Sequence, residues 1–166
     1  MGLFGRQGKP WSDQVTLTRG ERVLVARQAP AGWVVATTHA LWLPDRAGLT
    51  RVGWESVDTA SWDRDSSVLA VREVGSTDGR PRRWTLRMDD DRDLLLLVKE
   101  QVRATVVTSR HADVAGGGVT VVARRPPGSD GLTWAVSADP GVDVGDVDVR
   151  RVIESRLAEM KAELGV

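Results

Sequence analysis

A dense group of arginines is the first feature of the sequence that could carry chemistry. It comprises Arg80, Arg82, Arg83 and Arg87. Guanidinium groups held close together bind phosphate or carboxylate through paired N–H donors, so the group predicts an anion-binding or partner-binding patch. The same residues also suit a solvated strand face whose arginine stems cover Trp84. We favour this second interpretation, because solvated runs of charge are the commoner case.

Ser109, His111 and Asp113 supply the residue types of a hydrolytic triad. Positions two apart fall on one side of a strand, whereas a triad needs three groups that converge on one point. The sequence also lacks the Gly-x-Ser-x-Gly turn that exposes a nucleophile in many hydrolases. We therefore predict a non-enzymatic protein without catalytic residues.

Metal and cofactor chemistry has little support in the sequence. There are no cysteines and only two histidines, His39 and His111. The run 116–118 is all glycine, but it lacks the Gly-Lys-Ser/Thr ending of a phosphate loop. Four aspartates near the last predicted helix lack the glutamate that completes a calcium loop, and they suit helix capping: Asp139, Asp143, Asp146 and Asp148. We predict no metal site and no cofactor.

The composition is that of a soluble protein. The chain has 166 residues, of which 41% are hydrophobic and 28% charged, and its net charge is zero. Nucleic-acid binding depends on a cationic surface, so we expect no nucleic-acid partner. The longest apolar run, 94–98, is far shorter than the roughly 20 residues that span a bilayer, and the N-terminus is too poor in apolar residues for a signal peptide. A cytoplasmic location follows as the expectation.

Seven short runs of strand-forming residues must position these side chains. They span 22–28, 32–38, 40–43, 49–53, 57–62, 67–73 and 82–88. In the last run Trp84, Leu86 and Met88 alternate with polar residues, which indicates one buried face. A helix then follows, with Asp89 or Asp90 as its cap, and we expect it to close the strands within a unit that spans 18–110.

The two ends of the chain lie outside this unit. We expect residues 1–17 to form a loose tail, pinned at most by Trp11. Residues 116–166 predict two strands and a helix, a ββα extension. The final helix has an apolar stripe, which predicts that the extension packs on the strands before it. Alternatively, the stripe forms a homodimer through Ile153, Leu157 and Met160.

Three stretches resemble the bacterial pleckstrin-homology-like (PH-like) domains: 32–43 (GWVVATTHALWL), 49–57 (LTRVGWESV) and 58–74. The resemblance covers roughly residues 18–110 and implies an α+β fold, a PH-like seven-stranded antiparallel split barrel capped by a helix. Such domains bind lipid headgroups, peptides or proteins and are rarely enzymes. Phosphoinositide-binding members place several cations in the loop between the first two strands. Here that loop has only Arg27 beside it, so specific phosphoinositide binding is not expected.

The sequence therefore predicts a PH-like binding or scaffolding module whose partner is another protein rather than a lipid. Two alternatives remain open. One is a small ligand-binding protein or enzyme with a pocket between the barrel and the extension. The other is an adaptor at the membrane surface. Most of the seven tryptophans should be buried, and one or two left exposed would mark a partner surface.

Overall fold

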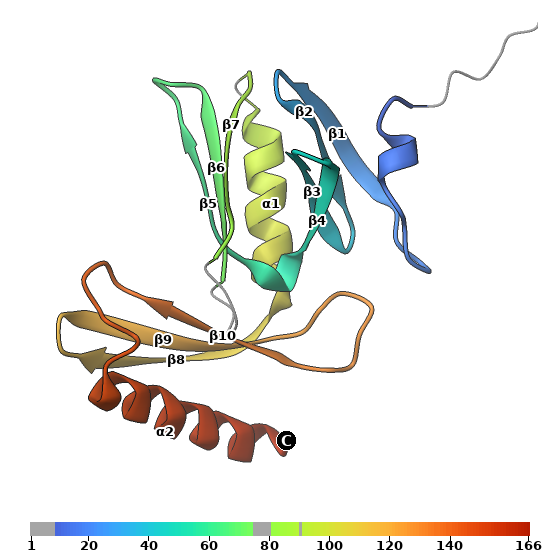
Figure 1. Cartoon of the computed structure of the whole chain (residues 1–166). Coiled ribbons are helices and arrows are strands. Elements are labelled where there is room, and N and C mark those ends of the chain that lie inside the picture. Colours follow the sequence, from blue (N-terminus) through green and yellow to red (C-terminus); the bar gives the residue numbers. More distant parts are fainter. Residues whose placement is uncertain (1–8, 75–80, 90) are drawn as a thin grey trace, which may run out of the picture.

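Three antiparallel sheets and two helices make up this α+β protein (Figure 1). The computed structural model describes residues 9–74, 81–89 and 91–166. The sheets have four, three and three strands. Within the described residues no strand pairing joins one sheet to another, so the predicted barrel is present as separate sheets and is not closed.

The seven predicted strands form the first two sheets. The first sheet has the order β1-β2-β3-β4 and contains β1 (Val23–Ala29), β2 (Gly32–Thr37), β3 (Ala40–Asp45) and β4 (Gly48–Gly53). A short 3-10 turn, η2 (Trp54–Ser56), leads to the second sheet. This sheet has the order β5-β6-β7 and contains β5 (Val57–Asp63), β6 (Val68–Glu73) and β7 (Arg83–Arg87). Each strand begins and ends within two residues of its predicted limits.

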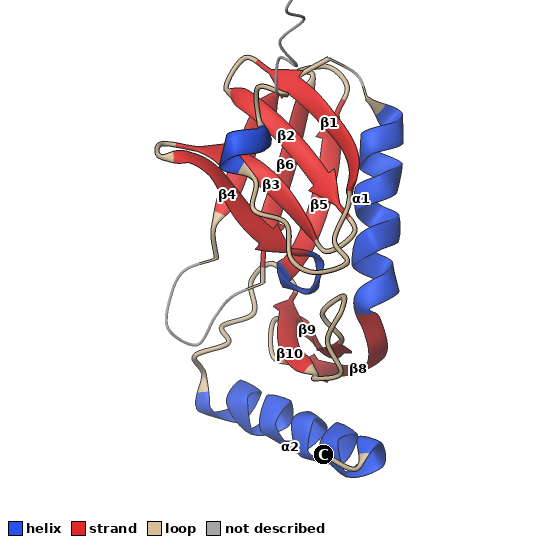
Figure 2. Ribbon diagram, turned by 90° about the vertical axis from the view of Figure 1, so that its right-hand side faces the viewer, coloured by secondary structure: helices blue, strands red, loops and turns tan. Residues whose placement is uncertain are grey.

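Helix α1 (Arg92–Thr105) lies between these two sheets (Figure 1) and runs along their open side (Figure 2). Its N-cap is Asp91, whose side chain accepts a hydrogen bond from the backbone N–H of Leu94 at 2.9 Å. The prediction of Asp89 or Asp90 as the cap was therefore wrong in its register. Asp91 also pairs with Arg27 of β1, which fixes the start of the helix against the first sheet.

The main core lies where the two sheets and α1 meet. Trp54 is fully buried and Trp84 is 8% exposed, and both pack in one cluster with Leu94 and Val98 of the helix. The pattern of the helix also predicts that Leu97 shares this core with Trp54 and Trp84, and Leu97 is partly buried and packs against the cluster. Leu94 and Val98 are four positions apart and so share the face of the helix that points into the core. Leu97 lies to one side of that face and is therefore less buried.

The N-terminal segment is not loose from residue 9 onward. Trp11 is 8% exposed and packs with Val35, Ala40 and Trp42 on the face of the first sheet that points away from α1. A 3-10 turn, η1 (Ser12–Gln14), follows it directly. The predicted tail is thus too long, since one large aromatic side chain brings its neighbours onto the sheet.

The extension contains one strand more than the sequence predicted. Helix α1 ends at Thr105, and the next residues form β8 (Val106–Val114), which pairs with β9 (Gly117–Arg124). With β10 (Thr133–Ala138) and α2 (Val147–Leu164) the extension is βββα. The helix ends at Thr105, where a run of β-branched residues that favour a strand begins. Gly116 lies in the β8–β9 turn with φ +87°, and Gly117 and Gly118 begin β9.

The stripe on α2 packs on the extension's own sheet and not on the first two sheets. Met160 is fully buried against Val121 and Ala123 of β9, with Ile153 and Leu157 partly buried in the same cluster. In Figure 1 the β8–β10 sheet lies between α2 and the rest of the molecule. The third strand widens the sheet enough to cover the helix. The residues offered for a homodimer are therefore already used within the chain.

Neither helix in the described part of the chain is both long enough and apolar enough to cross a membrane.

Candidate functional site

The predicted arginine patch does not converge on one point. Arg80 lies outside the described residues. Arg82 forms two hydrogen bonds with Glu73, both 2.6 Å, and its guanidinium lies 5.2 Å from the centre of the Trp84 ring. The hydrogen bond to Glu73 is the main reason that the pKa of Arg82 is raised. Its Nε and Nη2 donors are therefore engaged with a neighbouring strand of the same sheet.

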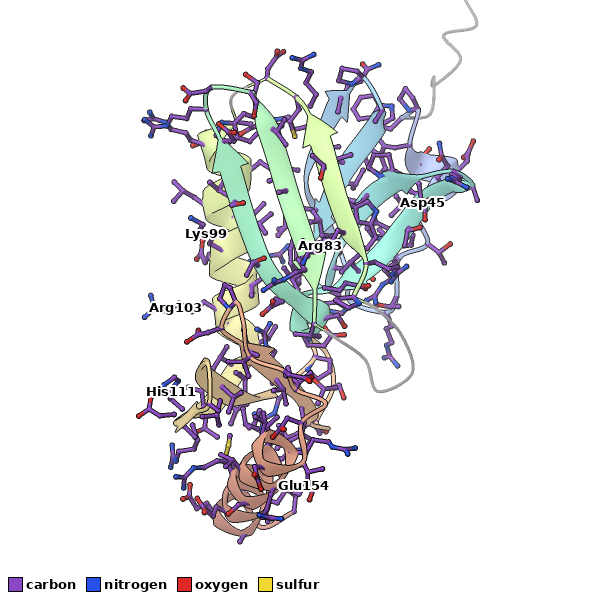
Figure 3. The ribbon with its side chains drawn as sticks, turned by 60° about the vertical axis from the view of Figure 1, so that its left-hand side comes forward. Asp45, Arg83, Lys99, Arg103, His111 and Glu154 are labelled. Carbon is purple, nitrogen blue, oxygen red and sulfur yellow. The ribbon has the colours of Figure 1, made fainter. Side chains whose placement is uncertain are left out.

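Arg83 and Arg87 are exposed on β7, four positions apart and so about 13 Å along the strand (Figure 3 labels Arg83). Arg83 lies opposite Arg72, which pairs with Asp58. Thr85 lies between Arg83 and Arg87 on the same exposed face of β7. The arrangement matches the solvated strand face that the sequence favoured.

His111 has two of the contacts of a triad, but Thr120 takes the place expected for Ser109. Its Nδ1 lies 3.1 Å from Thr120 Oγ1, and its Nε2 lies 3.4 Å from Asp113 Oδ1. The side chain of Asp113 is 97% exposed, and that of His111 is 57% exposed (Figure 3 labels His111). A catalytic base of this kind needs a site that excludes water. None of the three residues lines one of the described cavities.

The aspartates near α2 hold the backbone. Asp146 caps α2 by accepting from the N–H groups of Asp148 and Val149. Asp139 accepts from Gly118 N at 2.9 Å, and Asp143 accepts from Gly145 N at 2.8 Å. In the described ranges no three or more histidine or acidic side chains gather as metal ligands do.

A cavity of about 500 Å³ lies at the junction between the first two sheets and the extension. Its walls are Thr38, the end of α1 and the 125–129 loop. Arg125 is the only charged residue among those that line it. The lining residues of this cavity thus contain no pair of an acid and a base.

The strongest candidate is a groove between α1 and β5, which we call the α1–β5 groove. It contains two recesses that follow one another along the same pair of elements. The lower recess has a volume of about 390 Å³ and is lined by Asp58, Thr59, Ala60, Lys99, Val102, Arg103 and Val106. The upper recess has a volume of about 260 Å³ and is lined by Trp62, Arg64, Arg92, Leu95 and Leu96.

One wall of the groove is an edge strand. β5 pairs with β6 on one side only, so part of its backbone N–H and C=O groups faces away from the sheet. The opposite wall is the flank of α1, where Leu96 is 63% exposed and Val106, just after the helix, is 40% exposed. Exposed apolar side chains beside an open strand edge are the two features that an extended peptide needs.

Sequence reasoning missed this groove, although a signal was present. Leu94, Leu95, Leu96 and Leu97 are consecutive, and four consecutive positions span all sides of a helix. A helix that buries only one face must leave at least one of them outside the core. Trp62, one of the half-buried tryptophans, lines the same groove, as the expectation of an incompletely buried tryptophan at a partner surface suggests.

Among the described residues, the α1–β5 groove combines apolar walls, an open strand edge and several positive charges. Its function must be inferred from this chain itself. No protein-family model matches the chain, and neither the curated proteins nor the solved structures give a significant match.

Proposed function

We propose that this protein is a non-enzymatic binding module of the PH-like type, and that it captures an extended segment of a partner protein in the α1–β5 groove. The order of elements supports the PH-like part of the proposal. A four-stranded and a three-stranded antiparallel sheet follow one another, and a single helix comes directly after the seventh strand. This matches the strand count and order that the sequence resemblance implies.

The observation that carries the proposal is the open edge of β5 beside the exposed apolar flank of α1. An extended peptide can add its main chain to such an edge, and its side chains then fill the neighbouring recesses. Leu96 and Val106 supply apolar surface that the chain's own core does not cover. Exposed apolar surface at the rim of a groove is typical of a surface that binds a partner.

A lipid headgroup fits the described surface less well than a protein segment does. Arg27 is the only cation of the β1–β2 region that adjoins the loop, and it already pairs with Asp91. Phosphate capture depends on several uncommitted donors held close together. A partner protein is therefore the occupant that we propose.

The test is selection of peptides from a random display library on the intact protein. The groove variant carries Leu96→Ser together with Val106→Thr. The matched control carries Val147→Ser together with Val144→Thr, two exposed valines away from the groove with 63% and 49% exposure. We expect selected peptides to lose about tenfold or more in affinity for the groove variant, which is the effect of losing one buried apolar contact.

Chemical shift changes in the intact protein locate the bound peptide. The proposal requires the largest changes at backbone amides of β5 and α1. Equal affinity for the groove variant and the control variant, or shift changes confined to another face, would overturn it.

A further inference from the structure

We infer that the segment that occupies the α1–β5 groove is acidic, an inference that rests on the proposed function of that groove. The observation behind it is a row of cations along the rim. Arg92, Lys99 and Arg103 come from α1, and Arg64 follows the end of β5. Figure 3 shows Lys99 and Arg103 projecting outward from α1 on the side of the molecule where this helix runs beside β5.

Helix geometry places these cations together. At 3.6 residues per turn, positions 92, 96, 99 and 103 fall within a stripe about 60° wide, and Leu96 lies at the edge of this stripe. Leu95 and Val102 lie on the neighbouring stripe, between the cations and the core. A segment in the groove thus meets apolar side chains below it and positive charge along its rim.

These cations lie outside the ion pairs of the described part of the chain. Arg64, Arg92, Lys99 and Arg103 form no ion pair with any described carboxylate. The one acidic residue that lines the groove is Asp58, and it already pairs with Arg72. Because opposite charges across an interface favour the matching partner, the groove selects an acidic segment over a basic one.

The length of the row indicates the length of the segment. From residue 92 to residue 103 the helix rises about 16 Å, at about 1.5 Å per residue. An extended chain covers that distance in about five residues, at about 3.3 Å each. The expected ligand is therefore a short acidic stretch with an apolar side chain for the recess that Ala60 and Val102 line.

An anionic membrane surface would also attract these cations, but it explains less of the geometry. The apolar walls of the lower recess lie between the helix and the strand, where a flat bilayer surface does not reach. Ala60 is half-buried, whereas a bilayer contact would need the apolar residues on a convex surface. A peptide chain is narrow enough to enter, so a protein segment is the favoured occupant.

The experiment measures binding of two fluorescein-labelled peptides to the intact protein by fluorescence anisotropy. Both peptides have a central Leu-Val pair. In the acidic peptide this pair is flanked by Glu and Asp, and in its basic twin it is flanked by Lys. The charge variant carries Lys99→Gln together with Arg103→Gln. The matched control carries Arg19→Gln together with Arg150→Gln, which removes the same charge from exposed positions elsewhere.

We expect the acidic peptide to bind more tightly than the basic twin, and added salt to weaken its binding. The charge variant should bind it about fivefold or more weakly, as the loss of two partly exposed ion pairs implies, and the control should bind it as the wild type does. Equal binding of both peptides, or no effect of the charge variant, would overturn the inference.

The two proposals fail in different ways. If Leu96→Ser with Val106→Thr still abolishes binding of the library peptides while charge has no effect, the groove is the binding site and its acidic preference is wrong. If those two substitutions have no effect, the proposed function itself is wrong. Vesicles of phosphatidylserine provide the remaining comparison. Vesicle binding that Lys99→Gln with Arg103→Gln abolishes, without any binding of the acidic peptide, would assign the cations to a membrane and overturn the inference.

Discussion

The Nη1 atom of Arg124 donates a hydrogen bond to the backbone oxygen of Val57 at 2.6 Å, and so joins β9 of the extension to the start of β5. The same nitrogen lies 3.4 Å from the backbone oxygen of Trp54. Arg124 is only 6% exposed, and its own backbone lies within the central strand of the extension's sheet. A buried arginine thus satisfies the carbonyl groups of the turn that connects the first two sheets.

Burial of Arg124 has a cost that its surroundings partly offset. Loss of hydration lowers the pKa of the guanidinium, while the negative charges of Asp58 and Glu55 act in the opposite direction. Arginine stays protonated under such conditions, because its ordinary pKa is far above neutral. The junction therefore contains a buried charged group whose hydrogen bonds to these carbonyl groups come from one side chain.

Replacement of Arg124 by methionine should destabilise the protein by about 1–3 kcal/mol, because the carbonyl groups of Val57 and Trp54 lose their donor while remaining buried. Urea denaturation of the purified variant measures this. Arg125→Met is the matched control, since Arg125 is exposed and adjacent, and its effect should stay within about 0.5 kcal/mol. Equal effects of the two substitutions would show that the contact of Arg124 contributes nothing specific.

The buried carboxylate of Glu21 should make the stability of the folded protein depend on pH. The side chain of Glu21 is buried and accepts hydrogen bonds from Thr18 N at 2.9 Å, from Thr18 Oγ1 at 2.8 Å and from Thr37 Oγ1. Burial acts to raise its pKa, but these hydrogen bonds together outweigh burial, so the pKa is lowered from 4.5. A lowered pKa means that the charged carboxylate stabilises the folded state.

The stabilisation by Glu21 should be complete above the ordinary pKa of glutamate, 4.5, which the unfolded chain has. It should be lost as the pH falls through the lower pKa of the folded state. Glu21→Gln should therefore cost about 1–3 kcal/mol near neutral pH, and the difference from the wild type should shrink in acid. Denaturation midpoints of both proteins over a pH series measure this. A difference that stays constant down to the acid limit would contradict the assignment.

The first two sheets could be predicted closely because local signals agreed there. Turn residues mark the ends of each strand, and alternation identifies the buried face of β7, where Trp84 and Leu86 are indeed buried. Strand β8 could not be predicted in the same way, since α1 passes directly into it without a turn residue. Residues 105–108 are β-branched and favour a strand, but no turn residue separates them from α1, and pairing with β9 fixes where the strand begins.

The groove could not be predicted because it depends on tertiary structure. The sequence places Lys99 and Arg103 in the second half of a helix, where cations are favoured by the helix dipole alone. Only the position of α1 beside the edge strand β5 places these two cations at the rim of the proposed binding groove. In the same way, no local pattern indicates that Arg124 reaches a turn about seventy residues earlier in the chain.

Trp84→Ala should destabilise the protein by about 3–5 kcal/mol, since Trp84 is 8% exposed in the main core and alanine leaves a cavity there. Urea denaturation gives the free energy of unfolding. Thr85→Ala, at the exposed neighbouring position of the same strand, is the control and should change it by less than about 0.5 kcal/mol. A loss of under about 1 kcal/mol for Trp84→Ala would contradict the central place of this side chain.

Substitution of Met160 distinguishes packing of the α2 stripe on the extension's own sheet from homodimer formation through this stripe. Met160 is fully buried against β9, so Met160→Ala should destabilise the extension by about 2–5 kcal/mol, the usual cost of such a truncation in a core. The mass in solution, measured by light scattering, should stay the same. Glu154→Ala, at an exposed position of α2 that Figure 3 labels, is the control for substitution in this helix.

A homodimer through Ile153, Leu157 and Met160 predicts the opposite pattern. Truncation of a residue at a dimer interface should lower the mass from that of a dimer toward that of a monomer, and the effect should depend on protein concentration. Within one chain Met160 already contacts Val121 and Ala123, and a partner would have to displace these contacts before it could reach the side chain. We therefore expect concentration to have no influence on the unfolding of Met160→Ala. A concentration-dependent midpoint for the wild type that disappears in this variant would establish the dimer instead.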